Sequence, residues 1–144
     1  MRPREILEVA LYADDLPAAE HFYGGVLGLP VVARVEGRHV FFRCGGRMLL
    51  LFDPAGTRGG GSVPPHGAAG AGHVAFAASE AELDAWKASL AKAGIAVEQE
   101  HRWPGGGRSL YVRDPAGNSV ELATPAVWGI PEADVFGGPS AEVE

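Results

Sequence analysis

The pattern of hydrophobic and polar positions repeats once along the chain. Val9-Ala10-Leu11 and Val74-Ala75-Phe76 are short apolar runs, and each follows a polar residue, Glu8 in the first and His73 in the second. Each run ends in a turn that leads into a segment with helical spacing of its apolar residues. A repeat at an offset of 65 residues predicts two copies of one unit, each beginning with a strand and then a helix.

Both predicted helices have recognisable start and stop signals. The first begins near Leu16, after two aspartates that can cap it, and ends at Gly28. The second begins after Ser79, where Ser79-Glu80-Ala81-Glu82 has the form of a capping box, and ends at Gly94. Apolar residues recur every three or four positions in both segments, so we expect one face of each helix to be buried.

Three strand-like runs follow each helix. They span residues 30–35, 39–44 and 47–52 in the first half, and 95–100, 108–113 and 118–123 in the second. The order is therefore βαβββ twice, which predicts an α+β fold. We expect the two tandem modules to form a curved eight-stranded mixed sheet around a cleft, with the helices outside, because one module alone would leave a sheet face exposed.

The domain organisation follows from this repeat. We expect a first module over residues 5–54, a second module over residues 72–128, and a C-terminal tail over residues 129–144. Between the modules, residues 55–71 are rich in glycine and proline and form either a flexible linker or a lid loop. His66 lies in this segment and, in a lid, would close over the cleft.

Charge and composition narrow the class of protein. The formal net charge is −6 and lysines and arginines do not cluster, which argues against nucleic-acid binding. No apolar run approaches the ~20 residues that a membrane span needs, and the N-terminus does not have the form of a signal peptide. The single cysteine, Cys44, cannot form an internal disulfide. We therefore expect a cytoplasmic protein and, since small modules commonly pair, a homodimer.

Three polar residues occupy strand positions that are otherwise apolar: Glu8, His73 and Glu121. A buried carboxylate needs a counter-charge or a metal ion. One imidazole and two carboxylates suit a divalent cation such as Mn²⁺, Fe²⁺, Ni²⁺ or Zn²⁺. The alternatives are an exposed carboxylate for Glu8, a hydrogen-bonded core histidine for His73, and an ion pair of Glu121 with Arg43 or Arg113.

The order and spacing of several motifs resemble the vicinal oxygen chelate superfamily. This superfamily includes glyoxalase I, fosfomycin-resistance thiol transferases, bleomycin-binding proteins, methylmalonyl-CoA epimerase and extradiol dioxygenases. The motifs that carry the resemblance, within residues 5–128, are Ala13-Asp14-Asp15-Leu16, Phe22-Tyr23, Val26-Leu27-Gly28-Leu29, Gly72-His73-Val74-Ala75-Phe76 and the run from Tyr111 to Leu122.

The resemblance has implications for the metal site. His73 and Glu121 match ligand positions in metal-binding members, and Glu8 stands where a histidine or glutamine is common. Leu50 stands where glyoxalase I has a carboxylate, which argues against the glyoxalase I reaction itself. Only one of the three candidate ligands, His73, is a histidine, which argues against the two-histidine iron site of extradiol dioxygenases.

The resemblance also implies positions in the substrate pocket. Ser109 and Tyr111 stand where fosfomycin-resistance transferases have a serine and a tyrosine that line the site, so Tyr111 is a candidate catalytic residue. Glu121 is a second one, because a carboxylate displaced from the metal could serve as a base. Arg43 and Arg113 match each other in the repeat. An inward-facing arginine would bind a substrate carboxylate or phosphonate, and an outward-facing one would be solvated.

Two functions remain open at this stage. One is a metal-dependent enzyme, of lyase, isomerase or transferase type, that acts on a small substrate chelated through adjacent oxygens. The other is a metal-free, drug-binding protein like the bleomycin-resistance members. Trp103 and His66 would line the rims of the site in either case.

Overall fold

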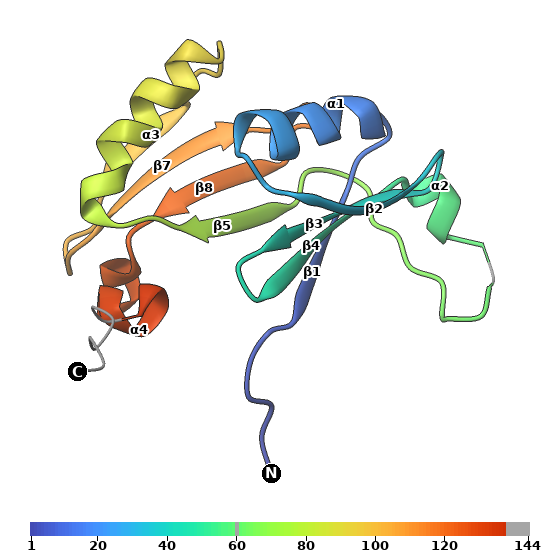
Figure 1. The fold of residues 1–144 in the computed structure, drawn as a ribbon, viewed down its shortest axis with the longest axis horizontal. Coiled ribbons are helices and arrows are strands. Elements are labelled where there is room, and N and C mark those ends of the chain that lie inside the picture. The colour runs from blue at the N-terminus through green and yellow to red at the C-terminus, as the bar shows by residue number, and fades with distance from the viewer. Residues whose placement is uncertain (60, 138–144) are drawn as a thin grey trace, which may run out of the picture. The chain divides into compact units, whose positions relative to one another are not determined.

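The structure is a computed structural model that describes residues 1–59 and 61–137 (Figure 1). Its strands are β1 (Glu8–Tyr12), β2 (Val31–Val35), β3 (His39–Cys44), β4 (Arg47–Phe52), β5 (His73–Ala77), β6 (Gln99–Arg102), β7 (Arg108–Arg113) and β8 (Ser119–Ala123). The α-helices are α1 (Leu16–Glu20), α2 (Pro54–Thr57), α3 (Glu80–Lys92) and α4 (Glu132–Phe136), with a π-helical segment η1 (His21–Val26) and a 3-10 helix η2 (Pro125–Trp128). None of the helices in these ranges is long and apolar enough to cross a membrane.

The two modules have the same strand order, so the predicted βαβββ repeat is confirmed. The eight strands form two four-stranded sheets, ordered β1-β4-β3-β2 and β5-β8-β7-β6. In the first sheet β1 pairs with β4 in parallel, and β3 pairs with β4 and β2 in antiparallel fashion. In the second sheet β7 pairs antiparallel with β6 and β8. By their contacts, residues 1–73 with the 114–118 turn form one compact unit, and the rest of the chain forms the other.

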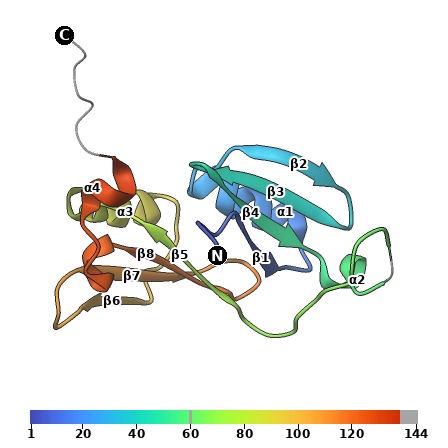
Figure 2. The same ribbon diagram turned by 90° about the horizontal axis from the view of Figure 1, so that it is seen from below.

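The first unit buries one face of its sheet under α1 and η1 (Figure 2). Asp15 caps α1 by accepting a hydrogen bond from the Ala18 amide at 3.0 Å. After Glu20 the helix widens, since the Leu27 amide bonds to the Phe22 carbonyl five residues earlier. Its buried core includes Leu11, Phe22, Tyr23, Val40, Phe42, Leu49 and Leu51.

Two predicted segments differ from the structure. The strand expected over residues 95–100 runs from Gln99 to Arg102, because the Ile95 amide bonds to the Leu90 carbonyl and closes the end of α3 instead. The segment after β4 contains the short helix α2, which the sequence pattern did not predict and which Asp53 caps through the Ala55 amide at 2.9 Å.

The predicted C-terminal tail contains the short helix α4. Residues 138–144 of the tail lie outside the described residues.

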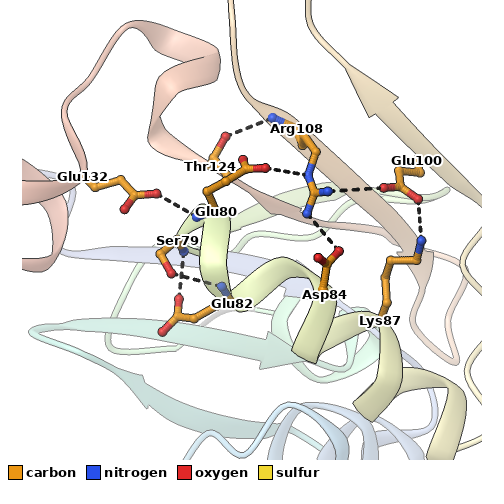
Figure 3. Close-up of polar contacts among 9 residues, drawn as sticks. All are labelled: Ser79, Glu80, Glu82, Asp84, Lys87, Glu100, Arg108, Thr124 and Glu132. Carbon is orange, nitrogen blue, oxygen red and sulfur yellow. Dashed lines mark hydrogen bonds and ion pairs between the residues drawn. The ribbon is translucent and has the colours of Figure 1, made fainter.

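In the second unit, α3 is held to its sheet by Arg108 of β7, whose side chain is only 8% exposed. The guanidinium forms ion pairs with Glu80 at 3.1 Å, Asp84 at 3.2 Å and Glu100 at 4.0 Å (Figure 3). The predicted capping box at the start of α3 is also present, with Ser79 and Glu82 bonding to each other's amides. Glu80 and Asp84 lie on α3, so the arginine connects this helix to the strand beneath it.

Replacing Arg108 by alanine should lower the free energy of unfolding by about 2–3 kcal/mol, because a buried cation and its packing are lost while the carboxylates can be solvated. Urea unfolding followed by far-UV circular dichroism measures this change. Lys87→Ala is the matched control, since Lys87 forms one surface ion pair with Glu100 at 2.8 Å and should cause a much smaller loss. Equal losses in the two variants would contradict a stabilising role for Arg108.

A buried polar network links the 114–118 turn to the rest of the first unit. Asp114 accepts hydrogen bonds from the Tyr23 hydroxyl at 2.7 Å and from the Asn118 side chain at 2.8 Å. Its other carboxylate oxygen accepts from the amides of Ala116 at 2.9 Å and Asn118 at 2.8 Å. Asn118 also donates to the Tyr12 carbonyl at 3.1 Å and accepts from the Gly72 amide at 2.7 Å. The network thus fixes the chain immediately before His73.

Burial, and then the charge of Asp114, raise the pKa of the Tyr23 hydroxyl well above its usual value of 10.0. A folded-state pKa above the unfolded one means that the stabilisation is complete below about pH 10 and is lost as the pH rises above that value. The stability of the wild-type protein should therefore fall more steeply above pH 10 than that of Tyr23→Phe. Urea midpoints of both proteins between pH 8 and pH 11 test this, and parallel curves would contradict it.

Candidate functional site

The candidate site lies on the face of the second sheet opposite α3. Arg108 points to the helix, so Ser109, Tyr111 and Arg113, which follow it at alternate positions, lie on the other face of β7. The register places Tyr111 directly opposite Glu121 on β8 and opposite Gln99 on β6. Residues that sequence analysis selected for chemistry are thus brought together on one sheet face.

Glu121 is a buried carboxylate on this face, 7% exposed. Ser109, which is fully buried, donates its hydroxyl proton to Glu121 Oε1 at 2.6 Å. The indole N–H of Trp103 in turn donates to Ser109 Oγ at 2.9 Å. An indole nitrogen can only donate, so Ser109 must accept from Trp103 and directs its own proton to Glu121. This relay fixes the orientation of the Glu121 carboxylate.

Tyr111 extends the same network. Burial raises the pKa of its hydroxyl, the hydrogen bond with Ser109 lowers it, and the charge and hydrogen bond of Glu121 raise it. The net direction is upward, so the hydroxyl keeps its proton at neutral pH and can donate it in a hydrogen bond. Tyr111 thus lies beside the carboxylate.

A cavity of about 400 Å³ opens on this face and is lined by Glu98, Gln99, His101, Trp103, Tyr111, Arg113 and Ser119. The rings of His101 and Trp103 meet edge to face with centroids 4.6 Å apart. Trp103 is 40% exposed. Aromatic and imidazole side chains with a few polar groups are typical of a small-molecule pocket.

The arginines and His66 differ in their surroundings. Arg113 lines the cavity and forms a two-point ion pair with Glu98 at 2.7 and 3.2 Å. Arg43 is exposed on β3. His66 belongs to the first unit, where its Nδ1 lies 2.7 Å from the Tyr12 hydroxyl and its ring meets Phe52 edge to face at 4.6 Å.

The proposed metal ligands come from both units. Glu8 is exposed on β1 and His73 begins β5, and both are grouped with the first unit, whereas Glu121 is in the second. Within residues 1–59 and 61–137, no group of three or more histidine, cysteine, aspartate or glutamate side chains could hold a metal ion. The chemistry of the donor set, one imidazole and two carboxylates, fits a divalent cation, and the ligand set stays a prediction.

Sequence analysis missed four cavity residues: Glu98, Gln99, His101 and Ser119. The segment Gln99-Glu100-His101-Arg102 is a wholly polar strand, so it lacks the apolar alternation that identifies a strand. Only the pairing of β6 with β7 identifies these residues as part of the site, because it places Gln99 opposite Tyr111 and His101 opposite Ser109.

Comparisons with known proteins agree with this architecture. A family model described as the Glyoxalase/Bleomycin resistance protein/Dioxygenase superfamily matches residues 5–122. The structure is similar to a lactoylglutathione lyase from Agrobacterium tumefaciens, at 50% identity and a TM-score of 0.87 over 90% of this chain and 100% of that one. It is also similar to a glyoxalase/bleomycin resistance protein/dioxygenase from Nocardioides, at 26% identity and a TM-score of 0.70 over 86% and 85% of the two chains. The search of curated proteins gave no match. The chain therefore belongs to the glyoxalase/bleomycin resistance protein/dioxygenase superfamily.

Proposed function

We propose that this protein is a divalent-metal-dependent enzyme, of lyase, isomerase or transferase type, that acts on a small substrate through adjacent oxygen atoms. The observation that carries the proposal is Glu121, a buried and oriented carboxylate beside a cavity lined by Trp103 and Tyr111. A carboxylate that is desolvated and fixed in orientation is suited to hold a cation or to accept a proton. The similarity to the lactoylglutathione lyase from Agrobacterium tumefaciens favours lyase chemistry among these three types.

In this proposal Glu8, His73 and Glu121 would hold the metal ion, which acts as a Lewis acid on substrate oxygens when bound. Leu50, buried on β4, contributes no ligand atom, so any second carboxylate ligand must come from another position, and Glu8 is the candidate.

The side chains around the cavity have separate roles. Tyr111 donates a hydrogen bond to a substrate oxygen from a hydroxyl that stays protonated at neutral pH. Trp103 and His101 bind and orient the substrate by ring contact and exclude water from one side. Arg113, already aligned by Glu98, and Arg43 are candidate contacts for a substrate anion. Ser109, fully buried, acts on the substrate only through Glu121.

Metal content is the first test of this proposal. Mass spectrometry of untagged protein, purified without chelators, should find close to one transition-metal ion per chain, and Glu8→Ala should lose it. A wild-type protein that stays free of metal after incubation with Mn²⁺, Ni²⁺ and Zn²⁺ would contradict the proposal.

We also propose that the protein is a cytoplasmic homodimer. Analytical ultracentrifugation at micromolar concentration tests the dimer, and a monomer mass would refute it.

A second candidate function rests on the half-exposed ring of Trp103. Its edge-to-face contact with His101 at 4.6 Å leaves an aromatic wall that suits stacking of a planar drug. The alternative is therefore metal-free sequestration, as in bleomycin-resistance members. Quenching of tryptophan fluorescence by a bleomycin-type compound in metal-free buffer, lost in the Trp103→Phe variant, would favour this function. Equal quenching in the wild-type protein and in Trp103→Phe would exclude Trp103 as the stacking ring.

A further inference from the structure

Arg38 is a half-buried arginine for which no carboxylate partner lies within residues 1–59 and 61–137. It lies at the start of β3, and it forms no ion pair with an aspartate or glutamate within the described ranges. Two exposed arginines of the same unit do have such partners, Arg34 with Glu20 and Arg47 with Glu5. The chain has 18 acidic and 12 basic residues, so carboxylates are not scarce. A partly desolvated cation that lacks one is suited to an anion from outside the chain.

The guanidinium of Arg38 is held in place by its neighbours. One nitrogen donates to His39 Nδ1 at 2.7 Å, and the group lies 5.8 Å from the centre of the Phe52 ring. Burial, and then the charge of Arg38, lower the pKa of His39, so its ring is a neutral acceptor. A guanidinium has five N–H donors, and His39 engages one nitrogen, so the planar fork is oriented with donors to spare.

A polar cavity of about 450 Å³ is lined by Arg38, by Thr57, Ser62 and His66, and by the neighbouring residues Gly56, Gly59, Gly61, Val63, Pro64 and Pro65. His66 is fixed by the Tyr12 hydroxyl at 2.7 Å. A Cβ at Gly56 would lie 3.0 Å from the Gly37 carbonyl and 3.2 Å from the Arg38 Cα. The first turn after β4 therefore abuts Arg38 directly, and a larger residue would displace it.

We propose that this cavity binds a small anionic group, a phosphate or a carboxylate, with Arg38 as its cation. The planar guanidinium matches both groups, because each offers two oxygens to a pair of parallel N–H donors. Thr57, Ser62 and His66 supply polar groups around the anion. All of these residues belong to the first unit, and the site needs no metal ion and none of the cavity residues around Glu121.

The test is a titration of ¹⁵N-labelled full-length protein with inorganic phosphate, and separately with acetate, at constant ionic strength. The account predicts saturable shifts of the Thr57, Ser62 and His66 amide signals, at millimolar concentration of at least one anion. Saturation by phosphate alone assigns a phosphoryl group, and saturation by acetate assigns a carboxylate. Arg38→Gln should weaken binding about tenfold or more, because a charge-assisted bidentate contact is lost.

Arg34→Gln is the matched control, since Arg34 lies in the same hairpin but is paired with Glu20, and it should bind as the wild type does. Arg38→Lys keeps the positive charge but loses the planar guanidinium, so it should bind the anion with intermediate strength. This variant tests the proposal if Arg38→Gln does not fold. Absence of saturable shifts with both anions would overturn the proposal. Equal anion affinity in Arg38→Gln and the wild-type protein would also overturn it, because Arg38 would then have only a structural role through His39 and Phe52.

Discussion

Replacing Asp114 by alanine should lower the free energy of unfolding by about 4 kcal/mol, because four donors, three of them buried, lose their acceptor at once. These donors are the Tyr23 hydroxyl, the Asn118 side chain, and the amides of Ala116 and Asn118. Tyr23 is fully buried and Asn118 is 2% exposed, so water cannot take the place of the carboxylate. A loss of this size is a large fraction of the ~5–15 kcal/mol that stabilises a typical domain.

Urea unfolding followed by circular dichroism measures the loss, and Asp53→Ala is the matched control. Asp53 also caps a turn after a strand, accepting from the Ala55 amide at 2.9 Å, but it lies nearer the surface. Losing one exposed cap should cost about 1 kcal/mol. Similar losses in the two variants would show that the buried network around Tyr23 contributes little.

The Glu121→Gln variant should lose divalent-metal binding and catalytic activity while it stays folded. Glutamine has the shape of glutamate, and its carbonyl can still accept the Ser109 hydroxyl, so the fold keeps its hydrogen bond. It removes the negative charge that the proposal needs for the cation, and affinity for Mn²⁺ or Zn²⁺ should fall by at least about 100-fold.

Glu98→Gln is the matched control for this variant. Glu98 lines the same cavity, but it is half-exposed and paired with Arg113, so its loss should leave metal affinity within a few-fold of the wild type. Isothermal titration with each cation compares the two. A Glu121→Gln protein that is fully loaded with metal and active would remove Glu121 from the site.

Local signals accounted for most of the fold. The Ser79–Glu82 capping box and the glycine at position 94 set both ends of α3, and the runs 39–44, 47–52 and 108–113 match β3, β4 and β7. The strand expected at 95–100 exists but begins later, at Gln99; its start was misplaced because Ile95 and Val97 alternate with alanine and glutamate as strand residues do. In the structure Ile95 instead completes the helix terminus through the Leu90 carbonyl, a tertiary preference that alternation cannot reveal.

The candidate site was predicted only in part. Tyr111 and Glu121 lie opposite each other because the 114–118 turn reverses the chain midway between them, and this could be inferred from spacing. The bond from Trp103 to Ser109 crosses the turn before β7. This hydrogen bond could not be inferred from the sequence, because it depends on the path of the glycine-rich turn between the two residues. The Arg108 ion pairs likewise join α3 to β7 and have no local signal.

The most direct test of the central claim is a crystal structure of the protein grown with Zn²⁺, with anomalous diffraction recorded at the zinc edge. The account predicts one strong anomalous peak per chain, with carboxylate oxygens of Glu8 and Glu121 and an imidazole nitrogen of His73 at about 2.0–2.2 Å from it. A peak held by other residues, or the absence of a peak at millimolar Zn²⁺, would contradict a metal site built from these three side chains.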